Sequence, residues 1–380
     1  MKIDANSVTF EPQDMAFVKK FGILKATEMA LDYHAEHPNL PFLYDAEQLA
    51  GFLGISRGEL NDIVNHIQKE YKETRLPKKD GTYRSLCVPS IRLRFCQDPI
   101  KEKILPQLPV SKFATAYQKG STTRGNAEPH IGKKFLLKLD ITDFFGSITF
   151  EQVQCAAFNT RYVSRQVGYL LTSLCCKDDS LPQGAATSPA LSNIVMYRFD
   201  DYIGRWCSQR QIAYTRYCDD MTFSANRPLY GVYQKVKTML REMGFELNES
   251  KTHFIGNDNR QSVTGLVVNE KLSIPSGYKR DLRQEVYYAL KFGVEDSVLH
   301  GHRSDFIEDG KPICCPTYML HLMGKVQYVL QIEPENLWFK DAQKKLLAYI
   351  YEHYSESLSY YLHFNKNGKG KGMYEQSNPV

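Results

Sequence analysis

The stretch Tyr217-Cys218-Asp219-Asp220 decides which fold we expect for this chain, because it sets two carboxylates side by side behind an aromatic residue. The flanking segments 214–216 and 221–224 alternate bulky and polar residues, which is typical of two short strands. We therefore expect the acidic pair at the tip of a β-hairpin. At such a tip two like charges can share a metal ion instead of repelling each other.

A second acidic element lies upstream, where the apolar segment 135–139 ends at Asp140. A carboxylate at the end of a buried strand can face a site. Three carboxylates from two strands can hold two Mg²⁺ ions about 3.5–4 Å apart, an arrangement that activates a 3′-hydroxyl and steadies the leaving pyrophosphate. We thus predict Asp140, Asp219 and Asp220 as catalytic metal ligands, whereas Asp143 is expected to stabilise the following turn.

Leu181-Pro182-Gln183-Gly184 lies between the two acidic elements and makes the combined pattern highly specific. A Tyr-x-Asp-Asp sequence alone is weak evidence, because paired acids in solvated turns are common. The order of a strand ending in Asp, then Leu-Pro-Gln-Gly, then Tyr-x-Asp-Asp resembles the palm and fingers of a reverse transcriptase. The resemblance implies an α+β right-hand polymerase, with a palm sheet backed by helices, fingers and a helical thumb.

Two further motifs narrow the resemblance to the retron reverse transcriptases, bacterial enzymes that copy a partner RNA into a branched RNA–DNA hybrid. They are Asn126-Ala127-Glu128-Pro129-His130 and Val263-Thr264-Gly265, and the likeness covers roughly residues 49–335. Three positions depart from the usual pattern. Ala186 stands where many relatives have Pro, Cys218 where many have Ala, and Ala116-Tyr117 where Gly-Phe is usual. All three are substitutions by small or similar residues.

The resemblance and the helical periodicity predict four parts. Residues 1–48 form a helical extension without an assigned role, 49–274 the fingers and palm, 275–364 a helical thumb, and 365–380 a flexible basic tail. Residues 187–206 are expected to form one long helix, starting beside the Ser188-Pro189 pair.

The fingers are expected to contact the incoming triphosphate through a hairpin around Asp80-Gly81. Its basic residues Lys78, Lys79 and Arg84 are the candidates, and Arg84 is preferred because a guanidinium can bridge two phosphate oxygens. The alternative is a surface hairpin with solvated cations.

The remaining nucleotide contacts follow from the resemblance. Phe145 falls where the family places an aromatic ring against the sugar, so we expect a preference for dNTPs, whereas Phe144 should point to the opposite face. Gln183 offers an amide to the nucleotide, and Gly184 lets the backbone approach it. The backbone carbonyl of Ile141 is a further expected metal ligand. The alternative for both phenylalanines is core packing.

Asn126 and His130 belong to an element that contacts RNA in retron-like enzymes, and we expect RNA contact there more than catalysis by His130. Arg216 precedes the acidic pair on its strand and is suited to pair with a carboxylate or a phosphate, so its role stays open.

Composition and charge agree with a nucleic-acid enzyme. The chain has 380 residues and a net charge of +5, but residues 69–134 hold fifteen Lys and Arg against six Asp and Glu, a field suited to a polyanion. No apolar run approaches the roughly 18 residues that span a bilayer, and no signal peptide is evident. Nine cysteines without zinc-site spacing indicate reduced thiols, so we expect a cytoplasmic protein.

The leading hypothesis is an RNA-directed DNA polymerase of a retron, with two Mg²⁺ ions, dNTPs and a structured non-coding RNA that serves as template and primer. The product would be multicopy single-stranded DNA primed from the 2′-hydroxyl of a guanosine, in antiphage defence beside a separate effector protein. One alternative is another bacterial defence or group II intron-like reverse transcriptase. Another is an RNA-binding scaffold that restrains a toxin.

Overall fold

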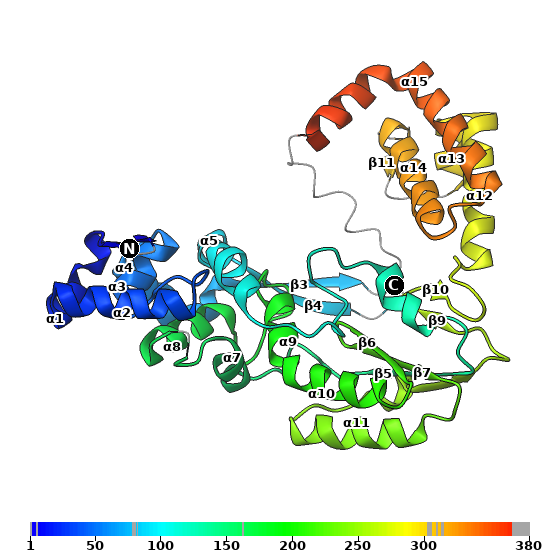
Figure 1. Ribbon diagram of the computed structural model, residues 1–380. Helices are drawn as coiled ribbons and strands as arrows, with labels where there is room; N and C mark the ends of the chain where they lie inside the picture. Colours follow the sequence, from blue (N-terminus) through cyan, green and yellow to red (C-terminus); the bar gives the residue numbers. More distant parts are fainter. Residues whose placement is uncertain are drawn as a thin grey trace. The chain divides into compact units, whose positions relative to one another are not determined.

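The computed structural model describes residues 2–4, 7–77, 81, 83–161, 163–301, 306–308, 311–312 and 315–366. The chain divides into two compact units. Unit 1 comprises Met1–Ser121 and Leu137–Phe254, and unit 2 comprises Thr122–Leu136 and Ile255–Val380. Both combine helices with paired strands, so the predicted α+β class is confirmed (Figure 1).

A four-stranded sheet has the order β6-β7-β5-β8, and most of its residues belong to unit 1. Its strands are β5 (Phe135–Asp140), β6 (Ala213–Tyr217), β7 (Asp220–Ala225) and β8 (His253–Gly256). Strands β6 and β7 form the expected antiparallel hairpin, with Tyr217 opposite Asp220. Because β5 lies next to β7, the two predicted acidic elements are neighbours in the sheet.

The helices that follow β5 in unit 1 are α7 (Phe150–Ala157), α8 (Arg165–Cys175), α9 (Ser188–Val195), α10 (Tyr197–Ser208) and α11 (Tyr230–Glu242). The expectation of one long helix over 187–206 is wrong, because α9 ends at Val195 and α10 begins at Tyr197. Met196 between them has a ψ angle of −3°, far from the roughly −42° that continues an α-helix.

The rest of unit 1 holds the predicted hairpin and the N-terminal helices. Strands β3 (Tyr71–Pro77) and β4 (Tyr83–Pro89) pair antiparallel. The helices are α1 (Met15–Phe21), α2 (Ile23–Glu36), α3 (Ala46–Leu53), α4 (Arg57–Asn65) and α5 (Ile91–Pro99). The first 48 residues are not wholly helical, since β1 (Lys2–Asp4) and β2 (Ser7–Thr9) also pair there.

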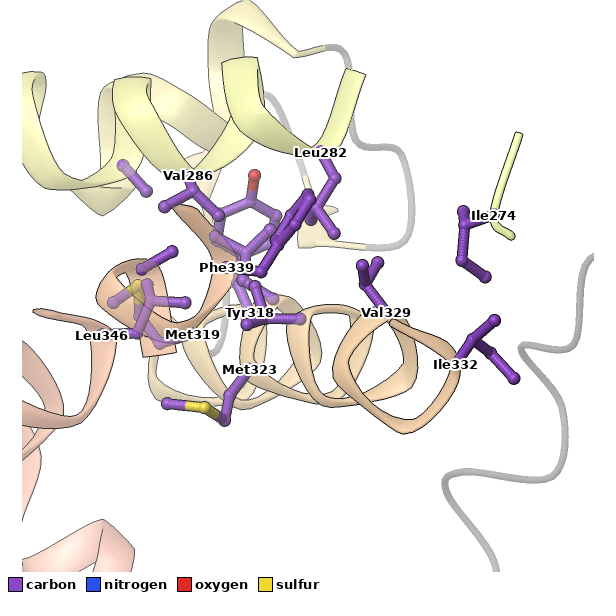
Figure 2. Close-up of a cluster of buried hydrophobic side chains, with 14 of the residues drawn as sticks. Ile274, Leu282, Val286, Tyr318, Met319, Met323, Val329, Ile332, Phe339 and Leu346 are labelled. Atoms are coloured by element: carbon purple, nitrogen blue, oxygen red, sulfur yellow. The ribbon is translucent and has the colours of Figure 1, made fainter. Parts of the chain in front are cut away.

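Unit 2 is built on a helical core. Its elements are α6 (Thr123–Ala127), β9 (Ser262–Val263), β10 (Leu266–Val267), α12 (Ser276–Phe292), α13 (Val294–His300), β11 (Ile307–Glu308), β12 (Lys311–Pro312), α14 (Cys315–Ile332) and α15 (Leu337–Lys366). Figure 2 shows side chains of α12, α14 and α15, among them Val286, Met319 and Phe339, meeting in one apolar cluster. Burial of these side chains away from water holds the helices together.

Short turns of 3₁₀ or π geometry complete the described elements: η1 (Pro12–Asp14), η2 (Ile67–Glu70), η3 (Ile100–Ile104), η4 (Leu105–Gln107), η5 (Glu128–His130) and η6 (Glu249–Lys251). The predicted tail from 365 onward overlaps α15 as far as Lys366, and its remainder lies outside the described residues. Within the described ranges, no helix combines the length and the apolar character that a bilayer crossing requires.

Candidate active site

The acidic pair sits at the turn between β6 and β7. Cys218 has a φ of 61°, a left-handed conformation that closes the turn, and Asp220 is the first residue of β7. The amide of Ile141 donates a hydrogen bond to the carbonyl of Asp219 over 3.2 Å. This bond joins the turn to the end of β5, where Asp140 is located.

Asp140 is only 6% exposed and pairs with a lysine that follows α11 in the chain. The Nζ atom of Lys251 lies 3.0 Å from both carboxylate oxygens of Asp140. The backbone supports this arrangement, because the amide of Asn248 donates to the Asp140 carbonyl over 2.8 Å. Lys251 therefore reaches Asp140 from the segment that leads into β8, the neighbour of β5.

Burial and the neighbouring negative charges raise the pKa of two of the carboxylates, Asp140 and Asp220. Burial, and next the negative charge of Asp219, raise the pKa of Asp220 to about 6. The pKa of Asp140 is also raised, mainly by burial, although the Lys251 hydrogen bond opposes the shift. Carboxylates that repel each other in this way attract a cation, and the attraction is stronger in a partly buried place than in water.

The chemistry of these side chains fits Mg²⁺, which prefers hard oxygen ligands. Their arrangement is looser than a complete metal site, since nowhere in the described part of the chain do three or more His, Cys, Asp or Glu side chains gather tightly enough to hold a metal ion. The ammonium of Lys251 supplies positive charge to Asp140 in this arrangement. The ligand roles of the three aspartates and of the Ile141 carbonyl remain predictions.

Arg216 is fully buried and fixes the hairpin next to its turn. Its Nε and Nη2 atoms donate to Asp200 of α10 over 2.9 and 2.5 Å, and its Nη1 donates to the carbonyl of Cys218 over 2.8 Å. Asp200 also accepts from the Tyr214 hydroxyl, and Asn193 of α9 accepts from Arg216. The question that the sequence left open is answered, because Arg216 binds a carboxylate.

Two of the departures from the family pattern contact each other. The hydroxyl of Tyr117 donates to the Sγ atom of Cys218 over 3.1 Å. Each of these residues has a left-handed backbone, with φ values of 59° and 61°. The residues usual in the family, Phe at position 117 and Ala at position 218, could not form this hydrogen bond. The contact therefore distinguishes this chain from those relatives.

The two phenylalanines after Asp140 lie in a turn, so the continued strand on which we based their opposite directions is absent, but the two rings differ in burial. Phe144 is buried, where its ring lies 6.2 Å from that of Phe245, and Phe145 is half-buried. Asp143 has a φ of 43°, and its carbonyl accepts from the Ser147 amide over 2.8 Å, which agrees with a role in the turn. Contact between Phe145 and a nucleotide sugar remains a prediction.

Gln183 and Gly184 lie against the hairpin of β3 and β4. The Cys87 amide donates to the Gln183 carbonyl over 2.7 Å. Gly184 has a φ of 125°, and a Cβ atom there would lie 2.8 Å from the Cys87 carbonyl oxygen, so the close approach that requires glycine is to β4. Arg84 is exposed on β4, and Lys78 and Lys79 lie outside the described residues. The nucleotide contacts of all five remain predictions.

The two motifs of the narrower resemblance meet in unit 2. The Asn126 amide donates to the Thr264 hydroxyl over 3.3 Å, and this hydroxyl donates to the Thr123 carbonyl over 3.2 Å. Asn126 and His130 are both buried, and burial lowers the pKa of His130 to about 3. Their burial indicates that they hold this element together, and their contact with RNA is untested.

The chain matches known proteins over most of its length. The family model for reverse transcriptase (RNA-dependent DNA polymerase) matches residues 76–268, about half of the chain. The retron Mx65 reverse transcriptase of Myxococcus xanthus is 30% identical over 320 residues, which cover 78% of this chain and 70% of that protein. The retron Ec83 reverse transcriptase of Escherichia coli is 34% identical over 233 residues, which cover 57% of this chain and 75% of that protein.

This chain belongs to the retron reverse transcriptases. A solved telomerase structure from Candida albicans is more distant, with a TM-score of 0.43 and 12% identity; the match covers 76% of this chain and 65% of the telomerase chain. The match to the family model and to the retron relatives confirms the predicted right-hand polymerase fold and the activity of an RNA-directed DNA polymerase. The hairpin of β6 and β7 and the end of β5 both lie within the matched region.

Two residues of this reverse transcriptase were missed from the sequence. Lys251 lies 111 positions after Asp140, and only the order of strands in the sheet brings the two together. Asp200 has no feature in the sequence that separates it from Asp201 beside it, and only the fold places it on the inward face of α10, against Arg216.

Proposed function

We propose that this reverse transcriptase copies a structured partner RNA into multicopy single-stranded DNA. Synthesis would begin at the 2′-hydroxyl of a guanosine in that RNA, giving a branched RNA–DNA product, and would serve antiphage defence in the bacterial cytoplasm beside a separate effector protein. The observation that carries the proposal is the placement of Asp140 at the end of β5, next to the hairpin that bears Asp219 and Asp220. Membership of the retron family supports the choice of template.

In this proposal, Asp140, Asp219, Asp220 and the Ile141 carbonyl hold two Mg²⁺ ions. When bound, the ions supply Lewis-acid activation of the attacking hydroxyl and charge neutralisation of the phosphates. Asp140 is buried and the two hairpin aspartates are half-buried. The raised pKa values of Asp140 and Asp220 favour the uptake of positive charge. Lys251, which touches Asp140, would exchange its partner or move aside as the cations bind.

We assign nucleotide selection to residues around this edge of the sheet. Phe145 would lie against the sugar and exclude a 2′-hydroxyl, and Gln183 would hold the nucleotide while Gly184 keeps its loop against β4. Arg84, together with Lys78 and Lys79, would contact the triphosphate, because guanidinium and ammonium groups bind phosphate oxygens. Residues 49–274 would be the fingers and palm.

Residues 275–364 would form a thumb that recognises the shape of the partner RNA. Helix α12 bears exposed rings at Tyr287, Tyr288 and Phe292, and the rings of Tyr288 and Phe292 stack 5.5 Å apart. The ammonium of Lys291 lies 5.0 Å from the Tyr287 ring centre and 5.1 Å from that of Phe292. Rings and a cation on one surface suit unstacked RNA bases and their phosphates.

The deciding experiment is a DNA synthesis assay on protein purified with and without its co-expressed RNA, followed by sequencing of the nucleic acid that co-purifies. The proposal expects DNA joined to one structured RNA, made only when that RNA is present. Equal synthesis on unrelated primed RNA, with no branched product, would favour another defence or group II intron-like reverse transcriptase. A bound RNA without DNA synthesis would favour a scaffold that restrains a toxin.

A further inference from the structure

A row of cationic and aromatic side chains runs along the outer surface of α10, and nothing in the proposed polymerase site uses it. Arg198, Tyr202, Trp206 and Arg210 follow one another at intervals of four residues. Because residues four apart share a face of a helix, the row follows one side of α10 and continues just past its end. Arg198, Tyr202 and Arg210 are exposed, and Trp206 is half-buried.

Helix α11, which runs alongside α10, adds a lysine to this row (Figure 1). The ammonium of Lys235 lies 5.0 Å from the ring centre of Tyr202 and 5.3 Å from that of Trp206, and it donates to the Tyr202 hydroxyl over 3.1 Å. The guanidinium of Arg210 lies 4.5 Å from the Trp206 ring centre. Attraction between cations and ring faces thus holds these charges in a fixed array.

In the described part of the chain, three cations of the array have no acidic partner. Arg205 pairs with Asp201 over 2.5 Å, but among the described residues no carboxylate forms an ion pair with Arg198, Arg210 or Lys235. Nearby, Arg227 donates to the Arg210 carbonyl over 3.1 Å and brings a further cation. A surface of fixed cations without acidic partners attracts a polyanion.

Helix α10 separates this array from the catalytic carboxylates. The inward side of the helix bears Asp200, which binds Arg216 of β6. Arg216 lies opposite Met221 and Tyr217 lies opposite Asp220 in the hairpin, so Arg216 and Asp220 project from opposite faces of the sheet. A strand of nucleic acid on the outer side of α10 would therefore occupy a site distinct from the polymerase site.

We propose that the α10–α11 array, defined by Arg198, Tyr202, Trp206, Arg210 and Lys235, is a second RNA-binding surface. It would hold a single-stranded part of the partner RNA that is outside the polymerase site, and in that sense it rests on the proposed function. Guanidinium groups bind phosphates in a fork, and bases stack on tyrosine rings and on guanidinium planes. The Tyr202 side chain is 47% exposed, so a base can stack on its ring, which favours RNA over an acidic protein.

The test is the variant R198Q/R210Q/K235Q, measured for binding to a fluorescent 30-nucleotide oligo(U) RNA. We expect binding to weaken roughly tenfold at about 0.1 M salt, and the slope of log Kd against log salt to fall by about two, since each phosphate contact in a single strand contributes about 0.7. Extension of a short poly(rA)/oligo(dT) duplex should be unchanged, which also shows that the variant is folded.

The matched control is K19Q/K20Q/K25Q, which removes three exposed cations from α1 and α2 and changes the net charge equally. Equal weakening in both variants, or less than twofold weakening in the first, overturns the proposal. Competition by polyglutamate as effective as that by oligo(U) also overturns it, in favour of an acidic protein partner. Failure of the proposed function has a different result: the unsubstituted protein, purified with its co-expressed RNA, would make no DNA.

Discussion

Arg216 and Asp200 form an ion pair that is completely shielded from solvent and joins the catalytic hairpin to α10. Because the same guanidinium donates to the Cys218 carbonyl, the pair sets the backbone immediately before Asp219. A buried charge pair of this kind is costly to break from one side, since the remaining charge has no solvent to stabilise it.

We expect D200N to lower the free energy of unfolding by about 3–5 kcal/mol, the range for removing one partner of a buried ion pair. R216K should retain a positive charge but lose the forked contact, so the rate of extension should fall at least tenfold at saturating dNTP with a smaller change in KM. The control is R205Q on the same helix, where the ion pair with Asp201 is exposed and contributes less than about 1 kcal/mol. Equal effects in R205Q and D200N would contradict the assigned role.

The Tyr117–Cys218 hydrogen bond should give a coupling free energy between substitutions at the two positions, measured in the free energy of unfolding. Y117F and C218A each remove it, so each should destabilise the protein, whereas the double variant should lose little more than either alone. The expected coupling energy is about 0.5–1 kcal/mol, as for a weak intramolecular hydrogen bond. Chemical denaturation of the four proteins measures it. Strictly additive losses would show that the contact has no energetic effect.

The raised pKa of Asp220 predicts how the free energy of unfolding depends on pH in the absence of metal. Its pKa of about 6 lies above the ordinary value near 3.9, so the folded state binds its proton more tightly than the unfolded state does. Stability is therefore lost as pH rises from about 4 to 6 and stays lower above that range. D220N should consequently raise the free energy of unfolding by about 1–3 kcal/mol at pH 7.5 in EDTA, with little gain at pH 4.

The control for this prediction is D143N, an identical chemical change at an exposed carboxylate in the adjacent turn. Its effect on stability should be small and should differ little between the two pH values. If D220N does not raise the free energy of unfolding at pH 7.5, burial and charge repulsion destabilise the ionised Asp220 less than its raised pKa indicates.

Phe145 should select the sugar of the nucleotide. F145A should raise incorporation of NTP relative to dNTP at least tenfold in single-nucleotide extension, because removal of the ring leaves room for a 2′-hydroxyl. F144A removes a buried ring instead, so it should destabilise the fold by about 3–5 kcal/mol without changing the ratio. An unchanged ratio in F145A would assign this ring to core packing.

The sequence predicted most of what is local in this fold. The alternation around Tyr217 predicted the hairpin of β6 and β7, and the Asp80-Gly81 pair predicted the hairpin of β3 and β4. It could not give contacts that depend on the order of strands, such as Lys251 with Asp140. The break at Met196 was also missed, because no Gly or Pro marks it; the inward direction of Asp200 and the burial of His130 become evident only in the folded chain.

The most direct test of the central claim is extension of a primed RNA template by D219N/D220N. The substitution keeps shape and removes the two charges of the hairpin, so DNA synthesis should fall below detection while cognate RNA is still bound and the protein still melts cooperatively. Extension at the parent rate by a folded, RNA-binding D219N/D220N protein would contradict the assignment of these carboxylates to catalysis.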